Sequence, residues 1–123
     1  KKVKFYLGDS AFWLKNMIEE ANQKSVIFLD AHWSCGTTAR GSIDVPLYPE
    51  LTLIKENQKH ECILIIDDVR LFGHGPATGQ AVHWEHINEN EILKVLGDRV
   101  TNHYYLPSTH AEKDRFIIHL GVC

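Results

Sequence analysis

Two segments decide the fold of this chain: SVIFLDAH at residues 25–32 and CILIIDD at residues 62–68. Each is a continuous run of aliphatic residues that ends abruptly in carboxylates. An apolar run without alternation is typical of a strand buried on both faces of a parallel sheet. We therefore expect the two strands to lie side by side and to run in the same direction. Their carboxyl ends would then bring Asp30, Asp67 and Asp68 to one edge of the sheet, where open α/β sheets bind ligands.

Around these segments the chain alternates between strand and helix patterns. Capping residues, prolines suited to a first turn and apolar residues at helical spacing mark three helices. The expected strands cover about residues 3–7, 25–29, 61–66, 99–106 and 115–120, and the expected helices about residues 10–23, 46–57 and 88–96. This order predicts an α/β fold, a Rossmann-like, mainly parallel sheet with helices on its faces. The last two strands are expected to form an antiparallel hairpin that adds an antiparallel strand at one edge.

Length and composition bound the class of protein. The 123 residues suffice for a single domain over 1–123, and 44% hydrophobic with 24% charged residues is ordinary for a globular chain. A formal net charge of −3 without an extended basic block argues against nucleic-acid binding. No apolar stretch approaches the length of a membrane span, and no signal peptide is recognisable. The odd count of cysteines, without CxxC spacing, favours reduced thiols and a cytoplasmic setting.

The three carboxylates that follow the two apolar runs are the first candidate site. Asp30, Asp67 and Asp68 would repel one another at one edge unless a cation or a hydrogen-bond donor shares the site. A hard divalent ion such as Mg²⁺ takes oxygen ligands of this kind and keeps several waters. Such an ion would orient an acceptor hydroxyl and lower its pKa. The alternative is that these residues cap loops, as aspartates after strands often do.

Two further groups lie near the same expected edge. His32 follows Asp30 by two residues and is a candidate base or metal ligand, with a histidine merely packed in the loop as the alternative. The turn formed by Gly8, Asp9 and Ser10 follows the first expected strand. Its glycine would let a ligand approach the backbone, and its carboxylate could accept from an amino group such as that of adenine. The same tripeptide is also a common turn.

Aromatic and basic residues occupy the two long loops at this edge. Trp33 and Phe72 are candidates to wall an acceptor pocket, although aromatic residues more often belong to a core. Arg40 and Arg70 flank the same edge, where either would pair with the aspartates or meet an anionic ligand group.

The motifs in this order resemble those of a known family. The segments GDS at 8–10, LDAHW at 29–33, PLYPEL at 46–51 and IIDDVRLFG at 65–73 resemble the later part of class I S-adenosylmethionine-dependent methyltransferases of the LDAH/IDDxRLF type. They are similar, more distantly, to metal-dependent O-methyltransferases of the catechol and macrolide-sugar type. The resemblance covers nearly the whole chain and implies strands three to seven of that fold.

The resemblance, taken with the residue chemistry, implies a set of site residues. These are His32 and Asp30 as catalytic residues; Gly8, Asp9, Ser10, Asp30, Ala31 and His32 at the S-adenosylmethionine; Asp30, Asp67 and Asp68 at Mg²⁺ or Mn²⁺; and Trp33, Arg70 and Phe72 at the acceptor. The implied reaction is methyl transfer to a hydroxyl of a sugar or small molecule.

The chain departs from the family pattern at its start. The glycine-rich loop after the first strand of the family, and the acidic residue after the second, have no counterpart here. The strand at residues 25–29 would then have an open edge. We expect a preceding segment or a partner chain, such as a second copy, to cover it, or the strand at residues 3–7 to pair with it directly. Two other functions stay open: a non-catalytic assembly domain of the same fold, and a metal-dependent hydrolase.

Overall fold

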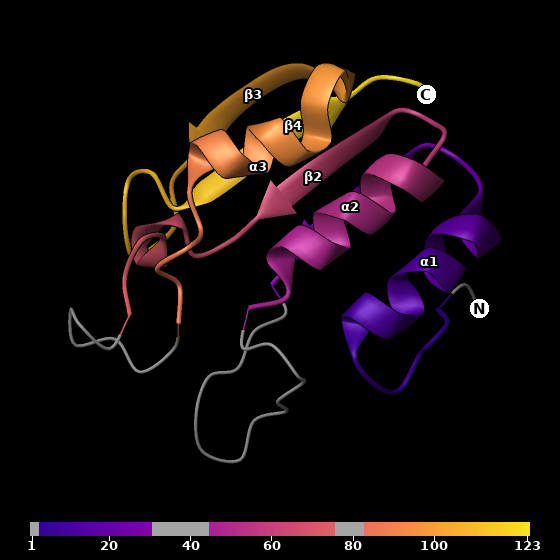
Figure 1. Ribbon diagram of the computed structural model, residues 1–123, viewed down its shortest axis with the longest axis horizontal. Coiled ribbons are helices and arrows are strands. Elements are labelled where there is room, and N and C mark those ends of the chain that lie inside the picture. The colour runs from indigo at the N-terminus through magenta and orange to yellow at the C-terminus, as the bar shows by residue number, and fades with distance from the viewer. Residues whose placement is uncertain (1–2, 31–44, 76–82) are drawn as a thin grey trace.

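The computed structural model describes residues 3–30, 45–75 and 83–123. The chain forms three α-helices and four strands within these ranges (Figure 1). In chain order they are α1 (Ser10–Ala21), β1 (Ser25–Leu29), α2 (Leu47–Asn57), β2 (Cys62–Ile66), α3 (Glu89–Leu96), β3 (Val100–Leu106) and β4 (Arg115–Leu120), with short 3₁₀ helices at Val69–Leu71 and Gly97–Arg99. The α/β class and most expected element boundaries are confirmed.

The four strands form one mixed sheet in the order β1-β2-β4-β3. Strands β1 and β2 are parallel neighbours, with Ser25 opposite Cys62 and Leu29 opposite Ile66. The central prediction, two apolar strands side by side and pointing the same way, is therefore confirmed. Strands β3 and β4 are antiparallel to each other as expected. The sheet is mixed rather than mainly parallel in its pairing, because β1–β2 is parallel whereas β2–β4 and β4–β3 are antiparallel. The expected position of the antiparallel strand is wrong, because β4 lies inside the sheet between β2 and β3, and β3 forms the edge.

The three helices lie together in one layer on one face of the sheet (Figure 1). Local sequence signals set their ends. The Asp9 side chain accepts a hydrogen bond from the backbone N–H of Ala11 at the start of α1, and the Asn88 side chain accepts one from Glu91 N at the start of α3. Gly97 ends α3 with a φ of +63°. Between helices and sheet lies a single apolar core, which includes Leu14, Ile18, Leu51, Ile54, Leu64, Ile66, Ile92, Leu96, Phe116 and Ile118.

The opposite face of the sheet corrects the expectation that both segments are buried on both faces. Val26 and Phe28 on β1 are 65% and 54% exposed, while Leu29 on the helix side is buried. No helix of the described ranges covers this second face, so helices do not lie on both faces as expected. A purely apolar run therefore did not distinguish a doubly covered strand from a strand with one open face.

The expected strand at residues 3–7 is wrong. This segment has no strand pairing, and Val3, Phe5 and Leu7 are 53%, 89% and 95% exposed. Its alternating pattern is suited to a sheet edge, but it does not pair with β1, so the sheet has four described strands rather than five. Among the described helices, none combines the length and apolar composition that crossing a membrane would take.

Candidate functional site

The aspartates that follow β1 and β2 converge at one edge of the sheet. One carboxylate oxygen from each of Asp30, Asp67 and Asp68 lies within 4.8 Å of the others. The convergence follows from the parallel pairing, which continues past the strands through a hydrogen bond of 3.3 Å from Asp67 N to Leu29 O. The gathering of the three carboxylates is as predicted. Their binding of a metal ion stays a prediction.

The backbone at Asp68 turns the chain away from β2. Its φ of +66° and ψ of +36° are left-handed, a conformation that aspartate adopts more readily than most residues. The 3₁₀ helix Val69–Leu71 begins directly afterwards. The side chains of Asp67 and Asp68 keep 18% and 14% of their surface exposed. They are thus partly desolvated, which strengthens their interactions with any cation that reaches them.

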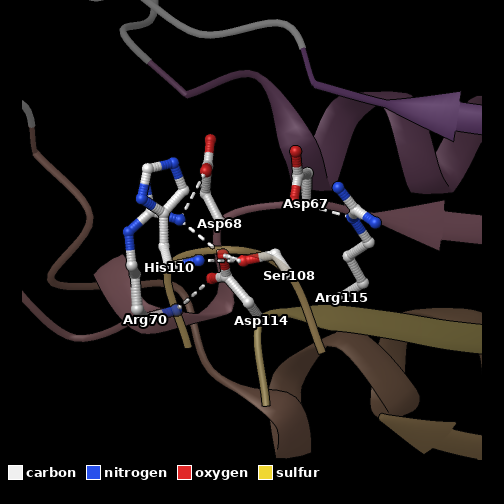
Figure 2. A network of polar contacts seen from close by, with 7 residues as sticks. All are labelled: Asp67, Asp68, Arg70, Ser108, His110, Asp114 and Arg115. Atoms are coloured by element: carbon white, nitrogen blue, oxygen red, sulfur yellow. Dashed lines mark hydrogen bonds and ion pairs between the residues drawn. The ribbon is translucent and has the colours of Figure 1, made fainter. Parts of the chain in front are cut away.

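Two arginines already contact this cluster (Figure 2). Arg70 Nη1 donates to Asp68 Oδ1 at 3.0 Å, which fits the expectation that Arg70 pairs with the aspartates. Arg115 Nε lies 3.6 Å from Asp67 Oδ1. The guanidinium groups compensate part of the negative charge of the cluster, since Arg70 also pairs with Asp114. This partial compensation reduces the repulsion between the carboxylates without an ion, as the loop-capping alternative requires.

Asp114 connects this network to the buried part of the protein. Its side chain is fully buried and accepts hydrogen bonds from Arg70 Nη1 at 2.6 Å, Arg70 N at 3.2 Å and Ser108 Oγ at 2.5 Å. Burial alone would raise the pKa of Asp114, but the hydrogen bonds and the positive charge of Arg70 outweigh it and hold the pKa below its usual value. Asp114 therefore stays ionised and fixes the Arg70 guanidinium beside Asp68.

A fourth acidic residue, Glu50, lies behind the cluster in the first turn of α2. It is 2% exposed, and its carboxylate accepts a hydrogen bond of 2.5 Å from Ser10 Oγ. The pKa of Glu50 is raised to about 7, mainly by burial; the bond from Ser10 opposes the rise and the nearby charge of Asp9 adds to it. Glu50 lines a small cavity together with Asp30 and Asp67.

The turn Gly8-Asp9-Ser10 has structural tasks at this edge. Asp9 caps α1 through a bond of 2.9 Å to Ala11 N, and Ser10 binds Glu50. Gly8 has a φ of +134°, and a Cβ there would lie 3.0 Å from the indole nitrogen of Trp13. Each residue is thus explained by local packing. The cofactor contacts implied for them stay predictions.

The remaining predicted site residues are only partly described. Ala31, His32, Trp33 and Arg40 lie outside the described residues. Phe72 packs against the core and stacks on Trp84, with ring centroids 6.1 Å apart.

Sequence reasoning missed Glu50, Asp114 and Arg115 as members of this site. A usable signal existed for Glu50, because it lies three residues after Leu47 and four before Ile54, on the apolar stripe of the helix. An acidic residue on such a stripe is buried when the helix packs. Asp114 and Arg115 gave no local signal, since the residues that connect them to this site, Arg70 and Asp67, lie far away in the sequence.

Comparison with protein-family models, with curated proteins and with solved structures finds no match to this chain.

Proposed function

We propose that this chain is a methyltransferase-type domain that transfers a methyl group from S-adenosylmethionine to a hydroxyl of a sugar or small molecule, with Mg²⁺ or Mn²⁺ at the aspartate cluster. The observation that carries the proposal is the convergence of Asp30, Asp67 and Asp68 at the carboxyl ends of two parallel strands. Open α/β sheets bind their ligands at this edge. The LDAHW and IIDDVRLFG motifs supply these same three residues.

The donor set suits a hard divalent ion. Two ligands of an octahedral Mg²⁺ at 2.0–2.1 Å lie at most about 4.2 Å apart. Of three ligands at most one pair can lie opposite one another, and the other pairs lie about 2.9 Å apart, so the oxygens that now lie within 4.8 Å would draw closer together around the ion. Asp30, Asp67 and Asp68 would hold the ion, and the ion would orient the acceptor hydroxyl and lower its pKa. S-adenosylmethionine would supply the methyl group, and His32 is the proposed base.

The arrangement of the sheet and of α1 supports the same proposal. Strands β3 and β4 close the sheet as an antiparallel pair, which is where the resemblance puts the sixth and seventh strands. Ser10 at the start of α1 is joined to Glu50, and Glu50 lines a cavity with Asp30 and Asp67. The Gly8-Asp9-Ser10 turn is therefore near the aspartate cluster, as a shared cofactor and metal site requires.

The metal part of the proposal is tested by Mn²⁺ binding, followed by electron paramagnetic resonance and calorimetry. Wild-type protein should bind one ion, and the double variant Asp67→Asn/Asp68→Asn should lose that binding. Asp98→Asn, which removes an exposed carboxylate just before β3, is the matched control and should bind as the wild type does. Retained binding in the double variant would remove the aspartates from the site.

The transfer part is tested by incubating the protein with Mn²⁺, methyl-labelled S-adenosylmethionine and a panel of sugars and small hydroxyl compounds. Label should appear in an acceptor, and the double aspartate variant should give none. Binding of neither S-adenosylmethionine nor Mn²⁺ would favour the second candidate, a non-catalytic assembly domain. The pairing of Asp68 with Arg70 and of Asp67 with Arg115 favours that candidate, since paired carboxylates need no ion. Hydrolysis of an ester or phosphate without a methyl donor would favour a metal-dependent hydrolase.

A further inference from the structure

Glu50 combines deep burial with incomplete hydrogen bonding. Its side chain is 2% exposed, at the start of a helix that packs on α1 and α3. Among the residues that the structure describes, Ser10 Oγ is the one hydrogen-bond donor to this carboxyl group, and it contacts Oε2. Buried carboxyl groups in proteins normally have partners for both oxygens. Within the described residues, the other oxygen of Glu50 accepts no hydrogen bond, so a further donor or a cation would complete its partners.

A cavity joins Glu50 to the aspartate cluster. It measures ≈ 10 Å³ and is lined by Asp30, Glu50 and Asp67 together with Leu29, Val45, Leu47, Ile66 and Trp84. This volume corresponds to about one water molecule, and three carboxyl groups give such a water enough polar partners. A metal ion often keeps several of its waters, and carboxylates that bind those waters tune its affinity.

Two arginines beside the cluster reduce its attraction for a cation, and a further carboxylate would offset that reduction. Arg70 and Arg115 approach Asp68 and Asp67 and weaken the attraction of the aspartates for a dication. Building on the proposed function, we propose that Glu50 is a fourth carboxylate of the cation site, which binds the ion through a water in the cavity that it shares with Asp30 and Asp67. Glu50 thus acts as a positioning residue behind the three direct ligands.

The charged groups that face Glu50 are all acidic within the described residues that surround it. Asp9 lies at the start of α1, and Asp30 and Asp67 lie at the ends of β1 and β2. The remaining cavity residues are apolar or aromatic. A divalent cation at the cluster would favour ionised Glu50, and ionised Glu50 would in turn favour the cation.

The test compares Mn²⁺ affinity of the wild type, Glu50→Gln and Glu56→Gln at pH 8.0 and pH 5.5. Glu56 is an exposed glutamate on the same helix and provides the matched control. At pH 8.0 the Glu50→Gln variant should bind Mn²⁺ about tenfold more weakly, the size of effect typical for residues that support metal ligands. The pKa of Glu50 is about 7, so at pH 5.5 the group is mostly neutral before the ion binds, and wild type and Glu50→Gln should differ much less in affinity than at pH 8.0. Glu56→Gln should match the wild type at both pH values.

The comparison at two pH values separates a charge effect from a structural one. Equal affinity of wild type and Glu50→Gln at pH 8.0 would overturn the role of Glu50 and leave the aspartate site standing. An equal loss at both pH values would also overturn it, because the variant would then have damaged the structure. Absence of Mn²⁺ binding in the wild type at both pH values would overturn both this proposal and the metal part of the proposed function.

Discussion

The two ends of helix α2 each bury a charged group, and the two groups are treated differently. Glu50 lies in the first turn, and Arg99 lies beneath the last turn, 7% exposed. The signs suit the helix dipole, which favours an acid at the amino end and a base at the carboxyl end. Burial and position are thus similar. The number of hydrogen bonds that each group makes is not.

Arg99 is fully engaged by backbone carbonyl groups. Its guanidinium donates to Gly121 O at 2.7 and 3.2 Å, to Gln58 O at 2.5 Å, to Lys55 O at 3.0 Å and to His60 O at 3.3 Å. These bonds join the end of α2 to the start of β2 and to the residue after β4. Arginine carries its charge at all accessible pH values. Arg99 is permanently charged and all its N–H groups donate hydrogen bonds, so its role is to hold these segments together.

Glu50 shows the opposite arrangement. One serine hydroxyl contacts its carboxyl group, and burial raises its pKa to about 7. The charge of Glu50 therefore depends on pH, and the residue lines a cavity that it shares with two of the clustered aspartates. The contrast with Arg99 indicates that burial alone does not mark a functional group. The proposed role of Glu50 depends instead on burial without complete partners, at the edge of the sheet where open α/β sheets bind ligands.

The largest effect on stability is expected from a substitution of Arg99, at the carboxyl end of α2. Arg99→Met should lower the free energy of unfolding by about 3–5 kcal/mol, because one buried and several partly buried carbonyl groups would lose their donors. Urea denaturation followed by circular dichroism measures this. Arg115→Met is the matched control, since Arg115 is 44% exposed in a pair at 3.6 Å and should cost about 1 kcal/mol or less. A cost below about 1 kcal/mol for Arg99→Met would contradict the structural role.

Glu50→Gln should have the next largest effect, and in the opposite direction. The pKa of Glu50 rises from 4.5 to about 7 on folding, so the folded state disfavours the charged form. Stability therefore falls as pH rises from about 4.5 through about 7, and the loss is complete above that range. Removing the charge should stabilise the protein at pH 8 by up to about 3 kcal/mol and leave it unchanged at pH 4.

Urea unfolding of wild type and Glu50→Gln across pH 4–8 measures this difference. A variant that is less stable than wild type at pH 8 would contradict this prediction. It would show that the interactions of the charged carboxylate stabilise the fold by more than its burial destabilises it. Together with weaker Mn²⁺ binding, a stabilised variant would show that the chain keeps a destabilising charge for the sake of its site.

The sequence predicted those parts of the fold that depend on local signals. The caps at Asp9 and Asn88, the stop at Gly97 and the parallel pair with its terminal aspartates all follow from spacing and residue type within a few residues. The segment at residues 3–7 has an equally good strand pattern, but a strand forms only where a neighbour pairs with it. Local pattern does not contain that information.

The candidate site divides along the same line. Asp30, Asp67 and Asp68 were predictable because parallel strands bring their ends to one edge. The pairing of Arg70 with Asp114 spans 44 residues, and the contact between Ser10 and Glu50 spans 40. Such contacts depend on how helices and loops pack over the sheet, which no short window of sequence reveals. The sequence predicted the edge of the sheet where the aspartates gather. Tertiary packing determined which arginines pair with them.

A somewhat smaller effect is expected from the cation itself. If Mn²⁺ binds the folded cluster and not the unfolded chain, a concentration of 100 times Kd should raise the free energy of unfolding by about 2.7 kcal/mol. Thermal and urea unfolding with and without Mn²⁺ at pH 8 measure this. The Asp67→Asn/Asp68→Asn variant should show no increase, whereas Arg99→Met, if folded, should keep it. Equal stabilisation of wild type and double variant would place the ion elsewhere.

The smallest and most specific effect is expected from Asp9→Asn. The substitution keeps the cap of α1, because an amide oxygen can still accept from Ala11 N, but it removes a negative charge near Glu50. Since that charge raises the pKa of Glu50, the pH at which Glu50 destabilises the fold should move down. The measured quantity is the change in unfolding free energy that Glu50→Gln causes at each pH, determined once in the wild-type chain and once in the Asp9→Asn variant. Taking this difference cancels every other titrating group, so an unmoved midpoint would mean that Asp9 and Glu50 do not interact.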